Sequence, residues 1–128
     1  LRLMPLRTGT IIRTPPIYFA RSSADLLAKS HPVLDHLLTI LVENPAVQLS
    51  IEGYTDNQGE PRALRKLAQQ RATTIKVFLV ERGIDARRLT TVGYGADCPV
   101  ADNTTEANRE LNRRVEFRVS EVKKDVKK

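Results

Sequence analysis

This sequence lacks several features that mark whole classes of protein. It has no tryptophan, one cysteine among 128 residues, and an aromatic content of 5%. The lone Cys98 excludes an internal disulfide bond. No apolar run approaches the ~20 residues that span a bilayer, so we expect no membrane insertion by this domain. Its cysteine and two histidines are far apart, which predicts no metal site, and nothing in the sequence calls for a cofactor.

The composition is ordinary for one globular domain with a strongly basic balance. Hydrophobic residues make up 41% and charged residues 28%, and the net charge is +6. Such a charge favours an anionic partner, which can be nucleic acid, acidic lipid or an acidic polymer. Much of the charge lies in a lysine-rich end, which we interpret as a basic tail over residues 121–128. The other basic residues are dispersed and no aromatic-rich basic strand is present, which disfavours nucleic acid.

The stretch from residue 47 to residue 82 is the most informative. Alternating apolar residues predict a strand over 47–52, and a turn with Asp56, Asn57 and Gly59 follows. Pro61 suits the first turn of a helix, and three- and four-residue apolar spacing predicts that this helix continues to Arg82. The sequence therefore predicts a strand, a polar turn and a long helix in succession.

Arg71 falls inside the apolar stripe of that helix. A guanidinium on a mostly apolar face needs a partner, because a buried unpaired charge is costly. The nearest candidate in this stretch is Asp56, in the turn before the helix. The sequence thus offers a carboxylate and a guanidinium at the end of one strand.

The remaining segments complete an alternation of strands and helices. Residues 1–16 are predicted to be an extended lead-in from a longer protein, with a short strand at 10–13, and residues 17–120 to be the domain. Ser30 is the expected N-cap of the first helix. The expected elements are a β-type run at 17–19, a helix to about residue 44, strand 47–52, helix 61–82, strand 89–94, a short helix at 105–112 and strand 115–119. This order predicts an α/β fold, a two-layer βαβαβ(α)β sandwich with helices packed on a mixed sheet.

Short motifs along residues 17–119 resemble the OmpA-like C-terminal domain. Each motif alone is weak, but their shared order and spacing make a strong signal. The motifs are Gly53-Tyr54-Thr55-Asp56-x-x-Gly59, Leu67-x-x-x-Arg71-Ala72, Gly83-Ile84, Gly93-Tyr94-Gly95 with Pro99, and Asn112-Arg113-Arg114-Val115-Glu116.

The resemblance implies a module that binds peptidoglycan non-covalently in the periplasm and anchors a larger outer- or inner-membrane protein. The signature ligand residues of the family match Asp56 and Arg71. The implied ligand is the meso-diaminopimelate of the stem peptide, whose free end carries an ammonium and a carboxylate. Asp56 suits the ammonium and Arg71 the carboxylate. The family includes monomers and dimers, so a homodimer stays open.

The resemblance assigns further residues to this site. In the turn these are Thr55, Asn57 and Gly59, whose backbone amides are potential donors. Arg113 or Arg114 is expected to play a supporting role at the edge of the groove. A purely structural alternative exists for both groups. Asp56 and Arg71 can form a plain ion pair, while one of the two later arginines lies over the sheet edge and the other pairs with an acid such as Glu116 or Asp97.

Three departures from the family pattern leave a second function open. Leu64 stands where the family usually has asparagine, Ala68 where it has serine, and Ala20 where it often has aspartate. These changes make the expected groove more apolar, and Leu64 removes a hydrogen-bonding amide. The alternative is a degenerate OmpA-like domain that acts as a protein–protein or structural module with weak or no peptidoglycan binding.

An enzyme is the less favoured class. The candidate nucleophiles Ser22, Ser23 and Cys98 have no evident histidine partner. His31 and His36 belong to the first predicted helix, far along the chain from Cys98. We therefore predict a binding module without catalysis.

Overall fold

The computed structural model describes residues 6–20, 23–97 and 99–123. Ser22, Cys98 and the end of the basic tail therefore lie outside the described residues. Among the described residues, no helix combines the length and the apolar character that crossing a membrane requires.

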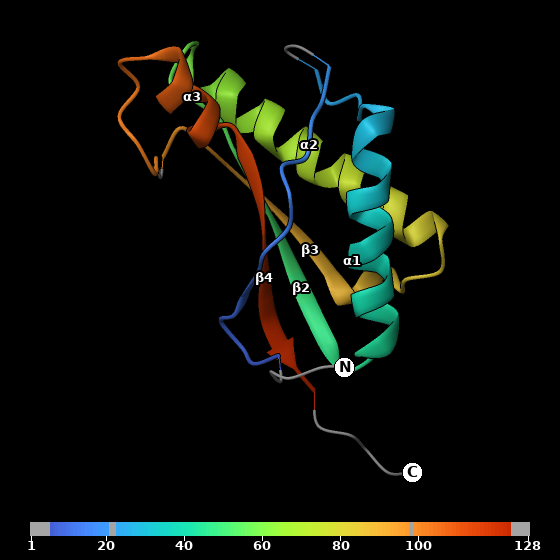
Figure 1. The fold of residues 1–128 in the computed structure, drawn as a ribbon. Coiled ribbons are helices and arrows are strands. Elements are labelled where there is room, and N and C mark those ends of the chain that lie inside the picture. Colours follow the sequence, from blue (N-terminus) through green and yellow to red (C-terminus); the bar gives the residue numbers. More distant parts are fainter. Residues whose placement is uncertain (1–5, 21–22, 98, 124–128) are drawn as a thin grey trace, which may run out of the picture.

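The chain forms a mixed four-stranded sheet in the order β1-β4-β2-β3 (Figure 1). The central strand β2 pairs in parallel with β3 and antiparallel with β4, and β1 pairs antiparallel with β4. The helices lie between the strands in sequence, which confirms the predicted α/β sandwich. The elements are β1 (Ile11–Ile12), α1 (His31–Glu43), β2 (Val47–Tyr54), α2 (Pro61–Glu81), β3 (Leu89–Gly95), α3 (Glu106–Asn112) and β4 (Arg114–Val122), with short 3₁₀ helices at Ala28–Ser30 and Ala86–Arg88.

One apolar core joins the helices to the sheet. The alternation in β2 buries Leu49 and Ile51 completely, and the alternation in β4 does the same for Phe117 and Val119. Leucines of α1 and apolar residues of α2 belong to the same cluster. Because both helices pack on this face of the sheet, the predicted inward positions of β2 and β4 are confirmed.

Helix α2 begins and ends as its sequence predicts. The Glu60 side chain caps its start by accepting a hydrogen bond from the Ala63 amide at 2.9 Å, and Pro61 opens the first turn. Gly83 follows the helix with a φ of 107°, a conformation that favours glycine. The helix lies very close to β3, where a Cβ on Gly93 would stand 2.5 Å from the Gln69 amide nitrogen.

Residues 17–19, which were expected to be the first β-type run of the domain, do not form a strand. Within that run, only Phe19 makes an isolated bridge, to Leu26. The sheet is instead extended by β1 in the region predicted as a short strand at 10–13. The backbone of Tyr18 is bonded elsewhere, because its carbonyl oxygen accepts a hydrogen bond from the Leu27 amide at 3.0 Å and so does not join a strand ladder.

Ser30 starts α1 without capping it through its side chain, contrary to the expectation. Its hydroxyl oxygen instead accepts a hydrogen bond from the Tyr18 amide at 2.7 Å. Tyr18 belongs to the displaced run at residues 17–19. The serine therefore ties that run to the start of the first helix.

Candidate functional site

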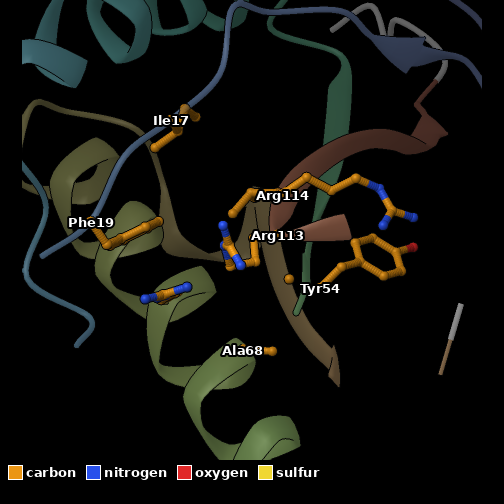
Figure 2. Close-up of a pocket in the computed structure, with 9 residues that line it drawn as sticks. Ile17, Phe19, Tyr54, Ala68, Arg113 and Arg114 are labelled. Carbon is orange, nitrogen blue, oxygen red and sulfur yellow. The ribbon is translucent and has the colours of Figure 1, made fainter. Parts of the chain in front are cut away.

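A groove of about 1120 Å³ runs between the early part of the chain and β4. One wall is the segment of residues 11–19, which we call the lead-in wall. The opposite wall is formed by residues 113–116 and by α3, and the turn after β2 and α2 close one end. Figure 2 shows a small cavity against these walls, with Ile17 and Phe19 on one side and Arg113 and Arg114 on the other.

Asp56 is held at the closed end of the groove by hydrogen bonds to both carboxylate oxygens. Its Oδ1 accepts from the Gln58 amide at 2.9 Å, and its Oδ2 accepts from Arg113 at 2.6 Å. The residue is only 7% exposed. The turn thus fixes the carboxylate in place before any ligand arrives, since its position depends on the backbone as well as on a side chain.

Arg113 connects Asp56 to a second acid. Its other terminal nitrogen lies 2.5 Å from Glu106, at the start of α3. The hydrogen bonds that Arg113 donates, first to Glu106 and then to Asp56, raise its pKa above the usual range. The same guanidinium lowers the pKa of Glu106. The three side chains form a chain of alternating charge along the groove, and the ion pair between Arg113 and Glu106 favours the charged forms of these two residues.

Arg71 does not pair with Asp56, and the ion pair considered from the sequence is therefore absent. Its Nε donates to the Ser23 carbonyl oxygen at 2.7 Å, and its guanidinium lies 5.0 Å from the Phe19 ring centroid. Arg113 reaches Asp56 instead, because β2 and β4 pair to their ends and place the start of β4 beside the turn. Among the described residues, no carboxylate forms an ion pair with Arg71.

The electrostatic environment of Arg71 favours an added anion. Burial lowers the pKa of this guanidinium, and the nearby Arg113 lowers that pKa further. Asp56 acts in the opposite direction but with the smallest effect of the three. A half-buried cation that is close to a second cation gains when a carboxylate enters beside it.

Arg114 pairs with an acid, as one of the alternatives from the sequence predicted. Its Nε donates to Glu116 at 2.8 Å, and its guanidinium lies 3.8 Å from the ring centroid of Tyr54. The other acid considered, Asp97, forms its ion pair with Arg65 at 3.7 Å. Arg114 lines the groove, while its Glu116 and Tyr54 contacts hold it along the sheet.

The structure brings together most, but not all, of the residues predicted for the site. The groove lining includes Thr55, Asp56, Leu64, Arg71, Arg113 and Arg114. Asn57 and Gly59 are exposed in the turn and are not part of that lining, whereas their neighbour Gln58 is. Leu64 is 9% exposed, and the nearest atom to a Cβ placed on Gly59 would be one of its methyl carbons. The leucine therefore contacts the turn as well as the groove.

Sequence reasoning missed several contributors. Glu106 carried no motif signal, and the Ser23 carbonyl is a backbone group that no residue type announces. Residues 11–16 of the lead-in wall were expected to be part of an extended lead-in with a short strand, and residues 17–19 to be a β-type run of the domain, so neither was assigned to the site. The one visible signal of this wall was the apolar run at residues 17–19, which the structure places beside Arg71 through Phe19.

Comparisons with known proteins agree with the fold and identify the family. The sequence model of the OmpA family matches residues 18–113. The chain is 42% identical over 90 residues to outer membrane porin F of Pseudomonas fluorescens, covering 70% of this chain and 28% of the porin. It is 36% identical over 105 residues to the peptidoglycan-binding protein ArfA of Mycobacterium tuberculosis, covering 82% and 32%. It thus spans about a third of the length of these curated relatives.

Solved structures show the same fold. The peptidoglycan-associated lipoprotein of Burkholderia pseudomallei superposes with a TM-score of 0.73 at 25% identity. The match covers 84% of this chain and 89% of that structure. The likeness therefore extends over nearly the whole of the solved domain.

Proposed function

This chain belongs to the OmpA family, and we propose that it binds peptidoglycan non-covalently through the free, zwitterionic end of meso-diaminopimelate. Asp56 takes the ammonium and Arg71 takes the carboxylate. The domain carries out no catalysis and anchors a larger envelope protein to the cell wall from the periplasm. Relatives named as a peptidoglycan-binding protein and a peptidoglycan-associated lipoprotein support this proposal.

The state of Arg71 is the observation that carries the proposal. This half-buried guanidinium uses Nε for the Ser23 carbonyl, and no described residue offers it a carboxylate. Its two terminal nitrogens can form parallel hydrogen bonds to a ligand carboxylate, a geometry that arginine favours. Because Asp56 lines the same groove, an amino acid end group finds both of its charges matched.

The ammonium has to share Asp56 with Arg113. Arg113 also contacts Glu106, so it keeps an acidic partner if the ligand draws the Asp56 carboxylate toward itself. The guanidinium then lies near the ligand carboxylate and adds to the attraction from Arg71. In this proposal Arg113 supports binding, and Arg114 stays on Glu116.

Co-sedimentation with purified sacculi tests the proposal. Wild type is expected to pellet with sacculi, and free meso-diaminopimelate is expected to release it into the supernatant. Asp56→Ala and Arg71→Ala are expected to stay in the supernatant, because they no longer bind sacculi, while their circular dichroism spectra remain those of a folded domain. Wild type that stays in the supernatant would instead support the degenerate module without wall binding. Pelleting that free meso-diaminopimelate does not reverse would contradict the zwitterion site.

A further inference from the structure

One edge of β4 is open where it borders the groove. On that edge Val119 accepts a hydrogen bond from the Gly9 amide and donates one to the Thr10 carbonyl, both at 2.8 Å, and Phe117 lies opposite Ile12. Backbone groups of a strand alternate in direction with a period of two. The N–H and C=O of Val115 therefore point to this same edge, away from β2.

The early part of the chain leaves β4 before it reaches Val115. The β1 register would continue by placing Thr14 opposite Val115, but the pairing stops at Ile12. Pro15 and Pro16 follow directly after Thr14 and cannot donate to a ladder. Among the described residues outside β2, none forms a hydrogen bond with the backbone of Val115, so its outward backbone groups are free to bind an added chain.

The space beside this edge is large and continuous with the zwitterion site. A small cavity of about 20 Å³, enough for one water molecule, has Ile17, Arg71 and Val115 among its lining residues. It shows that the lead-in wall does not close on β4. The whole groove, at about 1120 Å³, is slightly larger than the ~300–1,000 Å³ of pockets that hold drug-sized ligands. One amino acid end group leaves most of it unfilled.

We infer that the open edge of β4 at Val115 binds the peptide backbone of the stem peptide, so that the ligand adds to the sheet as a short extra strand. This inference rests on the proposed function, because the ligand's free end is held at Asp56 and Arg71. The diaminopimelate side chain then leads from Arg71 to the edge, and the next peptide group bonds to the Val115 N–H and C=O. Backbone addition of this kind is a general mode of peptide recognition.

The charges that line the groove favour the stem peptide as the ligand of this edge. The stem peptide carries carboxylates besides that of the zwitterion, and the groove presents more arginines than acids. The lining arginines are Arg13, Arg71, Arg109, Arg113 and Arg114, and the lining acids are Asp56, Glu106, Glu110 and Glu116. An acidic peptide in this groove therefore meets a small excess of positive charge, which includes Arg71 with no acidic partner among the described residues.

Amide hydrogen exchange with two ligands is the test. The ligands are free meso-diaminopimelate and the tripeptide L-Ala-γ-D-Glu-meso-diaminopimelate. Tripeptide is expected to bind about tenfold more tightly and to slow exchange at the Val115 amide, whereas free diaminopimelate leaves that amide fast. If both bind equally and the Val115 amide stays fast, the inference fails and the proposed function stands. If neither binds, both fail.

A proline replacement provides the matched variant. In the double variant Pro15→Val with Pro16→Thr the chain can continue pairing along β4 and cover Val115. We expect it to lose about tenfold in tripeptide affinity and to keep its affinity for free diaminopimelate. Pro45→Ala, a proline outside the groove lining, is the control and is expected to bind as wild type does. Unchanged tripeptide affinity in a double variant whose Val115 amide has become protected would overturn the inference.

Discussion

The guanidinium of Arg113 lies 2.6 Å from the Asp56 carboxylate, whereas Arg71 is bonded to the Ser23 carbonyl. These two groove arginines therefore have different roles. Arg113 neutralises a buried acid of the turn. Arg71 remains a cation with no acidic partner among the described residues, and is the one available to an incoming carboxylate.

Replacing these arginines separates stability from binding. Arg113→Ala leaves Asp56 buried without its ion pair, and we expect a loss of about 1–3 kcal/mol in the free energy of unfolding. Arg71→Ala removes one hydrogen bond and a ring contact, and we expect a loss of about 1 kcal/mol. Urea denaturation measures both. For sacculus binding we expect the reverse order, so that Arg71→Ala weakens binding more than Arg113→Ala does. The same order in both assays would contradict this division of roles.

The pair of Glu106 and Arg113 makes stability depend on pH. Arg113 lowers the pKa of Glu106 below the ordinary value of 4.5, so the folded state binds fewer protons than the unfolded state in this range. The contribution is present above pH 4.5 and is lost as pH falls through the lowered pKa. Thermal unfolding from about pH 6 to about pH 3 should therefore show a steeper decline for wild type than for Glu106→Gln. Parallel curves would show that the pair contributes nothing.

Leu64→Asn is expected to tighten ligand binding at some cost in stability. Asparagine offers a donor and an acceptor to the groove, where leucine leaves a ligand polar group unsatisfied. We expect a gain of roughly fivefold to a hundredfold in diaminopimelate affinity by titration calorimetry. Because Leu64 is mostly buried against the turn, the free energy of unfolding should fall by about 1–3 kcal/mol. Lost stability without tighter binding would show that this position serves the core alone.

Arg88 provides a stability control far from the groove. Its guanidinium donates to the carbonyl oxygens of Leu41, Asn44 and Val47 at 2.9–3.0 Å, and so joins the end of α1 to the start of β2. Arg88→Met leaves these acceptors unpaired, and we expect a loss of about 1–3 kcal/mol. The folded fraction should bind sacculi as wild type does. Weakened binding at full folding would mean that this end of the domain contributes to the ligand site.

The strands and helices could be predicted because their signals are local. Alternation in residues 47–51 and 115–119 and the caps at Pro61 and Gly83 determine backbone conformation over a few residues. The family motifs likewise placed Asp56 and Arg71 in one groove. Local patterns of this kind account for the sheet, for α2 and for the turn between them.

The pairing of charges could not be predicted, because it depends on contacts between distant segments. Arg113 and Asp56 are 57 positions apart in sequence, and only the register of β2 with β4 brings them together. The partner of Arg71 is a backbone carbonyl, which any residue supplies. Pro15 and Pro16 could have indicated that the run at 17–19 leaves the sheet, but apolar residues after a proline pair fit an edge strand equally well.

Titration calorimetry with the tripeptides L-Ala-γ-D-Glu-meso-diaminopimelate and L-Ala-γ-D-Glu-L-Lys tests the central claim most directly. In both tripeptides the α-amine of the third residue is acylated, and the lysine peptide keeps the side-chain ammonium but lacks the carboxylate beside it. Wild type should bind the diaminopimelate peptide at least about tenfold more tightly than the lysine peptide, and Arg71→Ala should bind the two alike, because the difference comes from the contact between Arg71 and that carboxylate. Equal affinity of wild type for both ligands, or a preference that survives in Arg71→Ala, would contradict the zwitterion site.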